Sequence, residues 1–132
     1  MKTTYRTTKT TVSMLNYHFV FCPRYRRKIF LIPDVEARFK ELLHQICEQN
    51  AIDVLAMECH ADHCHLFLNA PPTLGPADIM RIIKTNTARG LLSEFKEFEK
   101  THNLWTRSYF VSTAGDVSSA TIKRYVETQK TR

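Results

Sequence analysis

A short hairpin pattern near the middle of the chain constrains its fold most strongly. Segment 51–59 is apolar and β-prone, Ala61 and Asp62 suit a tight turn, and segment 63–69 is apolar and β-prone again. Such a pattern predicts two adjacent antiparallel strands joined by a turn. Any fold for this chain must therefore contain this β-hairpin.

The segments around the hairpin predict an α+β order. A strand is expected over 14–22, and Pro33 and Asp34 open a helix that ends near Asn50. A second helix begins at Pro76. Other expected elements are a polar arm or weak edge strand over 1–13, a helical continuation over 91–100, a strand over 108–111, and a last helix that follows Gly115 and runs to about Lys130. The order β-α-β-β-α-β predicts a ferredoxin-like antiparallel sheet with helices on one face, plus a C-terminal helix.

Length and charge bound the function. The chain of 132 residues suits a single domain over 1–132, and its hydrophobic share of 43% is ordinary for a globular protein. A formal net charge of +6 favours an anionic partner, with nucleic acid first among the candidates. A basic surface that only keeps the protein soluble is the alternative.

Cysteine usage and hydropathy predict the compartment. The four cysteines have no C-x-x-C spacing and lie in or beside apolar stretches, as buried thiols do. A reducing cytoplasm fits them best. The first residues lack the apolar run of a signal peptide, and no segment approaches the roughly 20 apolar residues that span a bilayer. We therefore expect a cytoplasmic protein with no membrane partner.

The hairpin carries a histidine pair, His63 and His65, separated by one residue. Successive side chains of a strand alternate between faces, so both imidazoles point to one face and can hold one divalent metal. A structural zinc site that adds Cys59 and His60 is an alternative. Those two are adjacent on a strand and project to opposite faces, which argues against it.

The last predicted helix carries Tyr125 and Gln129, four residues apart and therefore on one stripe. Tyr125 could simply pack its ring against the sheet. A phenol with a pKa of about 10 is a poor nucleophile unless a cation stabilises the phenolate. A nearby metal would do so while polarising a phosphodiester, and the Gln129 amide oxygen could be a third ligand of Mg²⁺ or Mn²⁺.

Four blocks of the sequence, in order and spacing, resemble the single-tyrosine, IS200-like transposases of the smallest insertion sequences. These enzymes belong to the HUH nuclease superfamily, which is named for two histidines that flank a bulky hydrophobic residue. The blocks are Asn16 to Arg26, Asp62 to Leu66, Leu104 to Phe110, and Tyr125 to Gln129. The chain departs from the pattern at Ala61, where proline is usual, and at Cys64, where valine is usual.

The resemblance implies a role for each matched residue. Tyr125 becomes the nucleophile that forms a 5′-phosphotyrosine link, and His63, His65 and Gln129 become the metal ligands. It also implies a homodimer in which the histidines of one subunit serve the tyrosine of the other, and a substrate of single-stranded DNA with hairpins near the element ends. The residues expected to contact this DNA are Arg24, Tyr25, Arg26, Arg27, Lys28, Arg81, Lys84 and Arg89.

The sequence leaves three alternative functions open. A relative domesticated by its host would process repeated hairpins. A ferredoxin-like nucleic-acid-binding module without chemistry would tolerate loss of Tyr125. A small structural zinc protein would differ from both in its metal content.

Overall fold

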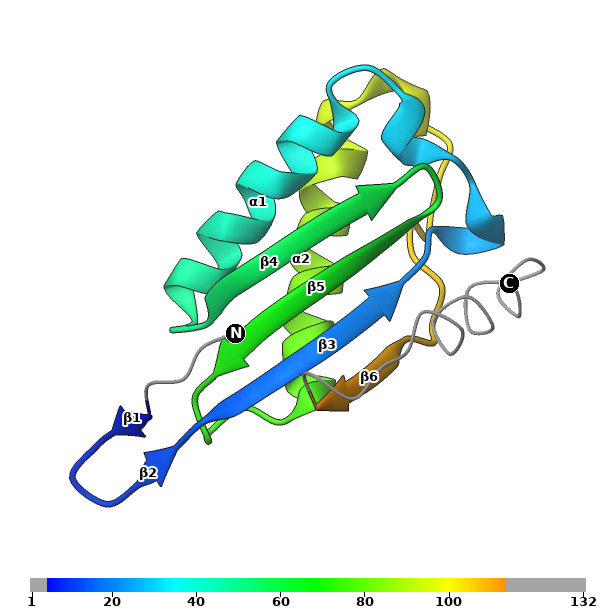
Figure 1. The fold of residues 1–132 in the computed structure, drawn as a ribbon. Coiled ribbons are helices and arrows are strands. Elements are labelled where there is room, and N and C mark those ends of the chain that lie inside the picture. Colours follow the sequence, from blue (N-terminus) through cyan, green and yellow to red (C-terminus); the bar gives the residue numbers. More distant parts are fainter. Residues whose placement is uncertain (1–4, 114–132) are drawn as a thin grey trace.

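Four antiparallel strands form the main sheet of the computed structural model, which describes residues 5–113. In spatial order they are β4 (Asp53–His60), β5 (His63–Ala70), β3 (Leu15–Phe21) and β6 (Phe110–Thr113). Helices α1 (Val35–Gln49) and α2 (Pro76–Glu94) lie on one face, behind the sheet in Figure 1. This arrangement confirms the expected ferredoxin-like α+β class.

Helix α1 follows the spacing seen in the sequence. Val35, Phe39, Leu43 and Ile46 lie on one stripe and are buried, because residues three or four apart share a helix face. The helix begins after Asp34, which adopts a left-handed backbone with φ of 69°. The apolar stripe is therefore what fixes α1 to the sheet.

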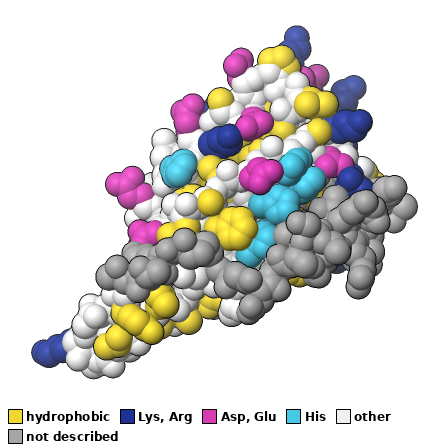
Figure 2. Space-filling view, viewed as in Figure 1, with side chains coloured by type: hydrophobic (Ala, Val, Ile, Leu, Met, Phe, Trp, Pro, Cys, Tyr) yellow, Lys and Arg dark blue, Asp and Glu magenta, His cyan; other side chains and the backbone are white. Residues whose placement is uncertain are grey.

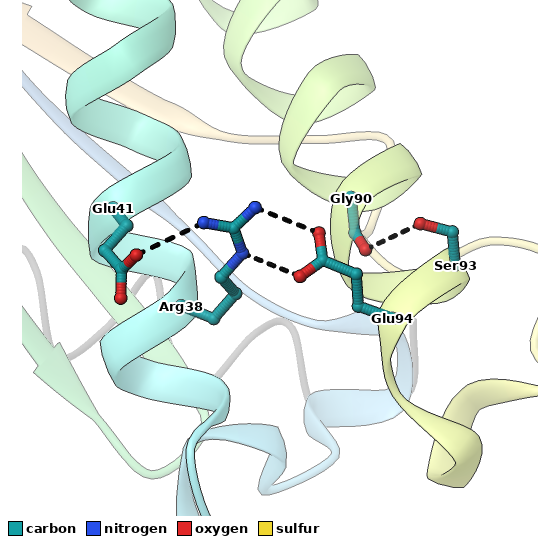
Figure 3. Close-up of polar contacts among 5 residues, drawn as sticks. All are labelled: Arg38, Glu41, Gly90, Ser93 and Glu94. Atoms are coloured by element: carbon teal, nitrogen blue, oxygen red, sulfur yellow. Dashed lines mark hydrogen bonds and ion pairs between the residues drawn. The ribbon is translucent and has the colours of Figure 1, made fainter.

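A surface ion pair joins the two helices at their exposed edge. Arg38 of α1 donates from Nε to Glu94 Oε1 at 2.7 Å and from a second nitrogen to Oε2 at 3.2 Å, and it also reaches Glu41 (Figure 3). Exposed pairs of this kind contribute little to stability, because water and salt screen them. Apolar packing between the helices is therefore the larger contribution.

Helix α2 ends earlier than the sequence suggested. The helix begins at Pro76, as expected, and Asp78 Oδ2 caps its start by accepting a hydrogen bond from the Gly75 amide at 3.0 Å. The helix stops at Glu94, Phe95 is extended, and a single 3₁₀ turn follows at Lys96–Phe98. The expected helical continuation over 91–100 therefore holds as far as Glu94 and is wrong from Phe95 onward. The break lets the chain turn and bury Phe98, which is 1% exposed.

The core lies between the helices and one face of the sheet. Phe19 and Phe21 of β3 and Leu66 of β5 are fully buried there. The Trp105 indole donates from Nε1 to Thr87 Oγ1 at 3.1 Å, so its polar group is satisfied inside the core. Within residues 5–113, neither α1 nor α2 covers the opposite face of the sheet (Figure 1).

The N-terminal arm forms a small ribbon of strands β1 (Arg6–Thr7) and β2 (Val12–Ser13). Arg6 fastens it to the main sheet by donating to Asn69 Oδ1 at 2.6 Å and to Asp53 Oδ2 at 3.2 Å. Within residues 5–113, no helix is long and apolar enough to cross a bilayer.

Candidate metal centre and nucleic-acid interface

Three imidazoles lie together on the face of the sheet that the helices leave uncovered. His63 and His65 project from β5 on this face, and His60 of β4 stands directly opposite His63 across the hairpin. One nitrogen from each ring lies within 4.8 Å of one from each of the others. Figure 2 shows histidine side chains gathered on this face. The described residues thus place three imidazole nitrogens close enough together to be candidate ligands of one metal ion.

Neighbouring side chains hold the two β5 histidines in place. Asp62 Oδ1 lies 2.9 Å from His63 Nδ1, and the other oxygen of Asp62 accepts from Arg26 Nε, also at 2.9 Å. His18 of β3 reaches His65, with 3.2 Å between its Nε2 and His65 Nδ1. The His18 ring is itself stacked on the Phe67 ring, with their centroids 4.1 Å apart. Contacts of this kind fix ring orientation, and in both rings they leave Nε2 for a ligand.

Burial and charge set the ionisation of this group. Burial, aided by the adjacent histidines, lowers the pKa of His65 to about 4. Burial also lowers the pKa of His18. For Asp62, burial raises the pKa, but hydrogen bonds from His63 and Arg26 outweigh it and the net shift is downward. His65 is therefore neutral near pH 7, the form that binds metals, and Asp62 is an anion.

The cysteines beside these histidines face the other way. Cys59 and Cys64 pair across the hairpin on the helix side, with their sulfurs 3.7 Å apart. Cys64 is fully buried, and burial raises the pKa of its thiol well above the ordinary value. Cys59 therefore does not share the face of His60, His63 and His65, so a zinc site that combines Cys59 with them does not form.

A basic pocket opens beside the segment that follows β3. Its volume is about 350 Å³. Tyr25 adopts φ of 60° and exposes 62% of its surface there, and the Arg24 guanidinium lies 5.5 Å from its ring. The residues that line the pocket are Arg24, Tyr25, Arg27, Lys100, Thr101, His102 and Asn103. Cations around an exposed aromatic ring suit an unpaired nucleotide.

Two other residues of the predicted DNA-contacting set are half-buried and held by partners within the protein. Arg26 is ion-paired with Asp62, with 2.6 Å between Nη2 and the carboxylate. Lys84 donates to the carbonyl oxygens of Thr106 and Arg107, and burial lowers the pKa of its ammonium group. Both therefore have a structural partner besides any phosphate.

The remaining three basic residues of that set are exposed. Lys28 follows the first 3₁₀ turn (Arg24–Arg26), and Arg81 and Arg89 lie on α2, in the layer behind the sheet. The structure thus gathers Arg24, Tyr25 and Arg27 in one pocket and leaves the α2 arginines apart from the histidines. Tyr125 and Gln129 lie outside the described residues.

Comparison with known proteins gives the family. The IS200-like transposase profile matches residues 11–129. The ISDra2 transposase TnpA of Deinococcus radiodurans is 32% identical over 121 residues, which cover 89% of this chain and 86% of that protein. The chain belongs to the IS200-like transposase family. It is therefore an enzyme that cleaves and rejoins DNA during transposition of an insertion sequence.

Solved structures agree with this assignment. A candidate transposase from Deinococcus radiodurans R1 superposes on this transposase with a TM-score of 0.87 at 31% identity, covering 96% of this chain and 99% of that one. A REP-associated tyrosine transposase bound to a REP hairpin reaches a TM-score of 0.59 at 13% identity, over 92% of this chain and 68% of the other. The second likeness shows the fold alone.

The donors on the uncovered face fit the divalent metal that the transposase family implies. Neutral imidazoles are common metal ligands, and the hydrogen-bonded rings of His63 and His65 have the outer support that such ligands have elsewhere. The sequence grouped His60 with this pair only in the zinc alternative that also required Cys59, and it did not group His18 with them. The two-residue turn was the available signal for His60, because it places that residue opposite His63. The contact of His18 with His65 could be predicted only from the pairing register of β3 with β5.

Proposed function

We propose that this transposase cuts and rejoins single-stranded DNA through a 5′-phosphotyrosine link to Tyr125. The observation that carries the proposal is the pair His63 and His65, which share one face of the sheet and are held by Asp62 and His18. An ion bound there, Mg²⁺ or Mn²⁺, would polarise the scissile phosphate and stabilise the phenolate. The resemblance to the family adds Gln129 as a further ligand.

The proposed reaction balances without an energy source. The Tyr125 oxygen forms a bond to phosphorus while the bond from phosphorus to the 3′-oxygen breaks. The phenol loses its proton to water, and the leaving 3′-oxygen gains one. Because the phosphotyrosine conserves the phosphodiester energy, a 3′-hydroxyl can later attack it and rejoin the strand. In this scheme His63 and His65 bind the ion, and Asp62 and His18 orient their rings.

The proposed substrate is single-stranded DNA with a hairpin near the element end. Its support is the pocket at Arg24, Tyr25 and Arg27, where phosphates can meet two guanidinium groups and a base can stack on the exposed ring. The REP-associated neighbour was solved bound to a REP hairpin, which agrees with a hairpin substrate. Arg26, Lys28, Arg81, Lys84 and Arg89 stay in the proposed contact set.

Assembly and location complete the proposal. On the family likeness, two copies form a homodimer in which the histidines of one subunit serve the tyrosine of the other. The cytoplasm is the proposed location, because the four cysteines are free thiols, which a reducing compartment maintains.

The test is a search for the covalent adduct. Wild-type protein with a labelled single-stranded hairpin substrate and Mg²⁺ or Mn²⁺ should give a protein-linked fragment on a denaturing gel. Tyr125→Phe removes only the hydroxyl, so we expect it to bind the hairpin but form no adduct. Tyr109→Phe is the matched control and should still form it, because Tyr109 is a partly buried core neighbour whose ring lies near Lys84 Nζ. An adduct that persists in Tyr125→Phe would refute the proposed nucleophile.

A further inference from the structure

We propose that His60 is a third imidazole ligand of the metal ion, beside His63 and His65, and that the three-imidazole set makes this transposase prefer Mn²⁺, Co²⁺ or Zn²⁺ to Mg²⁺. The proposal deepens the proposed function and depends on it only in taking the uncovered face to be a metal site. It concerns a residue that lies outside the H-x-H pair.

The geometry of the hairpin brings His60 to the pair. It stands opposite His63 in the β4–β5 register, and the two rings are stacked with centroids 4.4 Å apart. The His65 ring is 5.4 Å from His60 and 5.1 Å from His63. Nitrogens bound at about 2.1 Å to one ion stand roughly 3–3.5 Å apart. One nitrogen of each ring already lies within 4.8 Å of the others, so rotation of the His60 and His63 rings out of their stack would bring all three to one ion.

One nitrogen of each ring also contacts a polar side chain outside the proposed metal site. His63 and His65 use Nδ1, toward Asp62 and His18. His60 uses Nε2, which lies 2.8 Å from Glu58 Oε1. One nitrogen of each ring is left for an ion: Nε2 of His63, Nε2 of His65 and Nδ1 of His60. A carboxylate or imidazole behind each ligand is the arrangement that orients metal-binding histidines.

The donor set decides which ions are favoured. Mg²⁺ prefers oxygen ligands and gives up its water reluctantly, whereas imidazole suits zinc and the later first-row ions. A site with only two imidazoles and several oxygen ligands can still bind Mg²⁺ in competition with nitrogen-binding ions. A third imidazole moves the balance toward nitrogen-binding ions, so His60 becomes the residue that sets metal preference.

Direct titration of the protein without DNA tests this inference. Full-length, chelator-stripped protein is titrated with Co²⁺, Mn²⁺ and Mg²⁺, read by calorimetry and, for Co²⁺, by visible absorption. We expect wild type to bind Co²⁺ and Mn²⁺ more tightly than Mg²⁺, and His60→Asn to lose about tenfold or more in affinity for Co²⁺ and Mn²⁺ while changing little toward Mg²⁺. The Co²⁺ spectrum should shift as a nitrogen ligand is lost.

The control is His44→Asn, which removes an exposed imidazole on α1, in the layer behind the sheet, and should bind all three ions as wild type does. Circular dichroism confirms that both variants are folded. Unchanged Co²⁺ affinity and spectrum in His60→Asn would overturn the inference, as would equal wild-type affinity for Mg²⁺ and Mn²⁺. Because no cleavage is measured, protein that binds ions as expected but forms no adduct refutes the proposed function alone.

Discussion

Asp62 occupies the hairpin turn and connects two regions of the chain. One carboxylate oxygen meets the His63 ring, and the other accepts two contacts from Arg26, in the segment that follows β3. The carboxylate is mostly buried, with 17% of its side chain exposed. A single residue therefore sets the orientation of a proposed ligand and positions the basic segment relative to it.

We predict that Asp62→Asn weakens Mn²⁺ binding by about 10–100-fold, because an amide is a poorer support for the His63 ring than a carboxylate. Calorimetric titration without DNA measures the change. Asp53→Asn is the matched control: it also removes a carboxylate from the sheet, but one that lies at the far end of β4 and meets Arg6. Affinity equal to wild type in Asp62→Asn would show that the carboxylate does not support the metal ligand.

At the level of elements, α1 and α2 approach closely at Gly90. A Cβ added there would lie 2.6 Å from Leu42 Cδ1, closer than side-chain atoms pack, and 3.0 Å from Cδ2, so the Leu42 side chain would have to shift. Glycine within a helix costs about 1 kcal/mol relative to alanine. The close contact therefore accounts for a residue that helix propensity alone would disfavour.

We predict that Gly90→Ala destabilises the protein by about 1 kcal/mol, because overpacking of about 1–3 kcal/mol exceeds the gain in propensity. Urea unfolding measures the free energy. In a Leu42→Ala background the clash is gone, and the same substitution should become neutral or stabilising. A double-mutant cycle with a coupling below about 0.5 kcal/mol would contradict this account of the contact.

The elements were largely predictable because their signals are local. The apolar stripe of α1 and the turn at Ala61 and Asp62 both appear within a few residues of sequence. The end of α2 was not predictable, because Leu91, Phe95 and Phe98 keep helical spacing while the chain turns away to bury Phe98.

For the site, alternation along β5 predicted the shared face of His63 and His65. The contact of His18 with His65 depends on which strand lies beside β5, and this comes from the packing of the whole sheet. The pocket that brings Lys100 and His102 beside Tyr25 likewise joins segments far apart in the sequence.

The basic residues of the chain are divided between ion pairs on the helices and the pocket beside Tyr25. The net charge of +6 includes cations that are ion-paired on the helices, such as Lys40 with Glu36, and cations that line the pocket, such as Arg24 and Arg27. Only cations that replace counterions on DNA contribute to salt-dependent affinity. Position therefore matters more than total charge.

We predict that affinity for a single-stranded hairpin falls as salt rises and that Arg27→Ala reduces the salt slope by about 1. Fluorescence anisotropy over a range of salt concentrations gives the slope. Lys40→Ala is the matched control, since it removes the same charge from α1, and its slope should equal that of wild type. An equal reduction in both variants would mean that net charge, rather than the pocket, drives binding.

The hydrophobic core and the histidine cluster lie on opposite faces of the sheet, and this separation affects how such a chain can evolve. The hydrophobic core lies on the face covered by α1 and α2, while His60, His63 and His65 lie on the opposite face. A substitution at His63 or His65 removes no buried contact with either helix. If these histidines hold the proposed metal, a copy that has lost them can persist as a folded protein, and it can still occupy the DNA that active copies use or provide a host with a binding domain that no longer cuts.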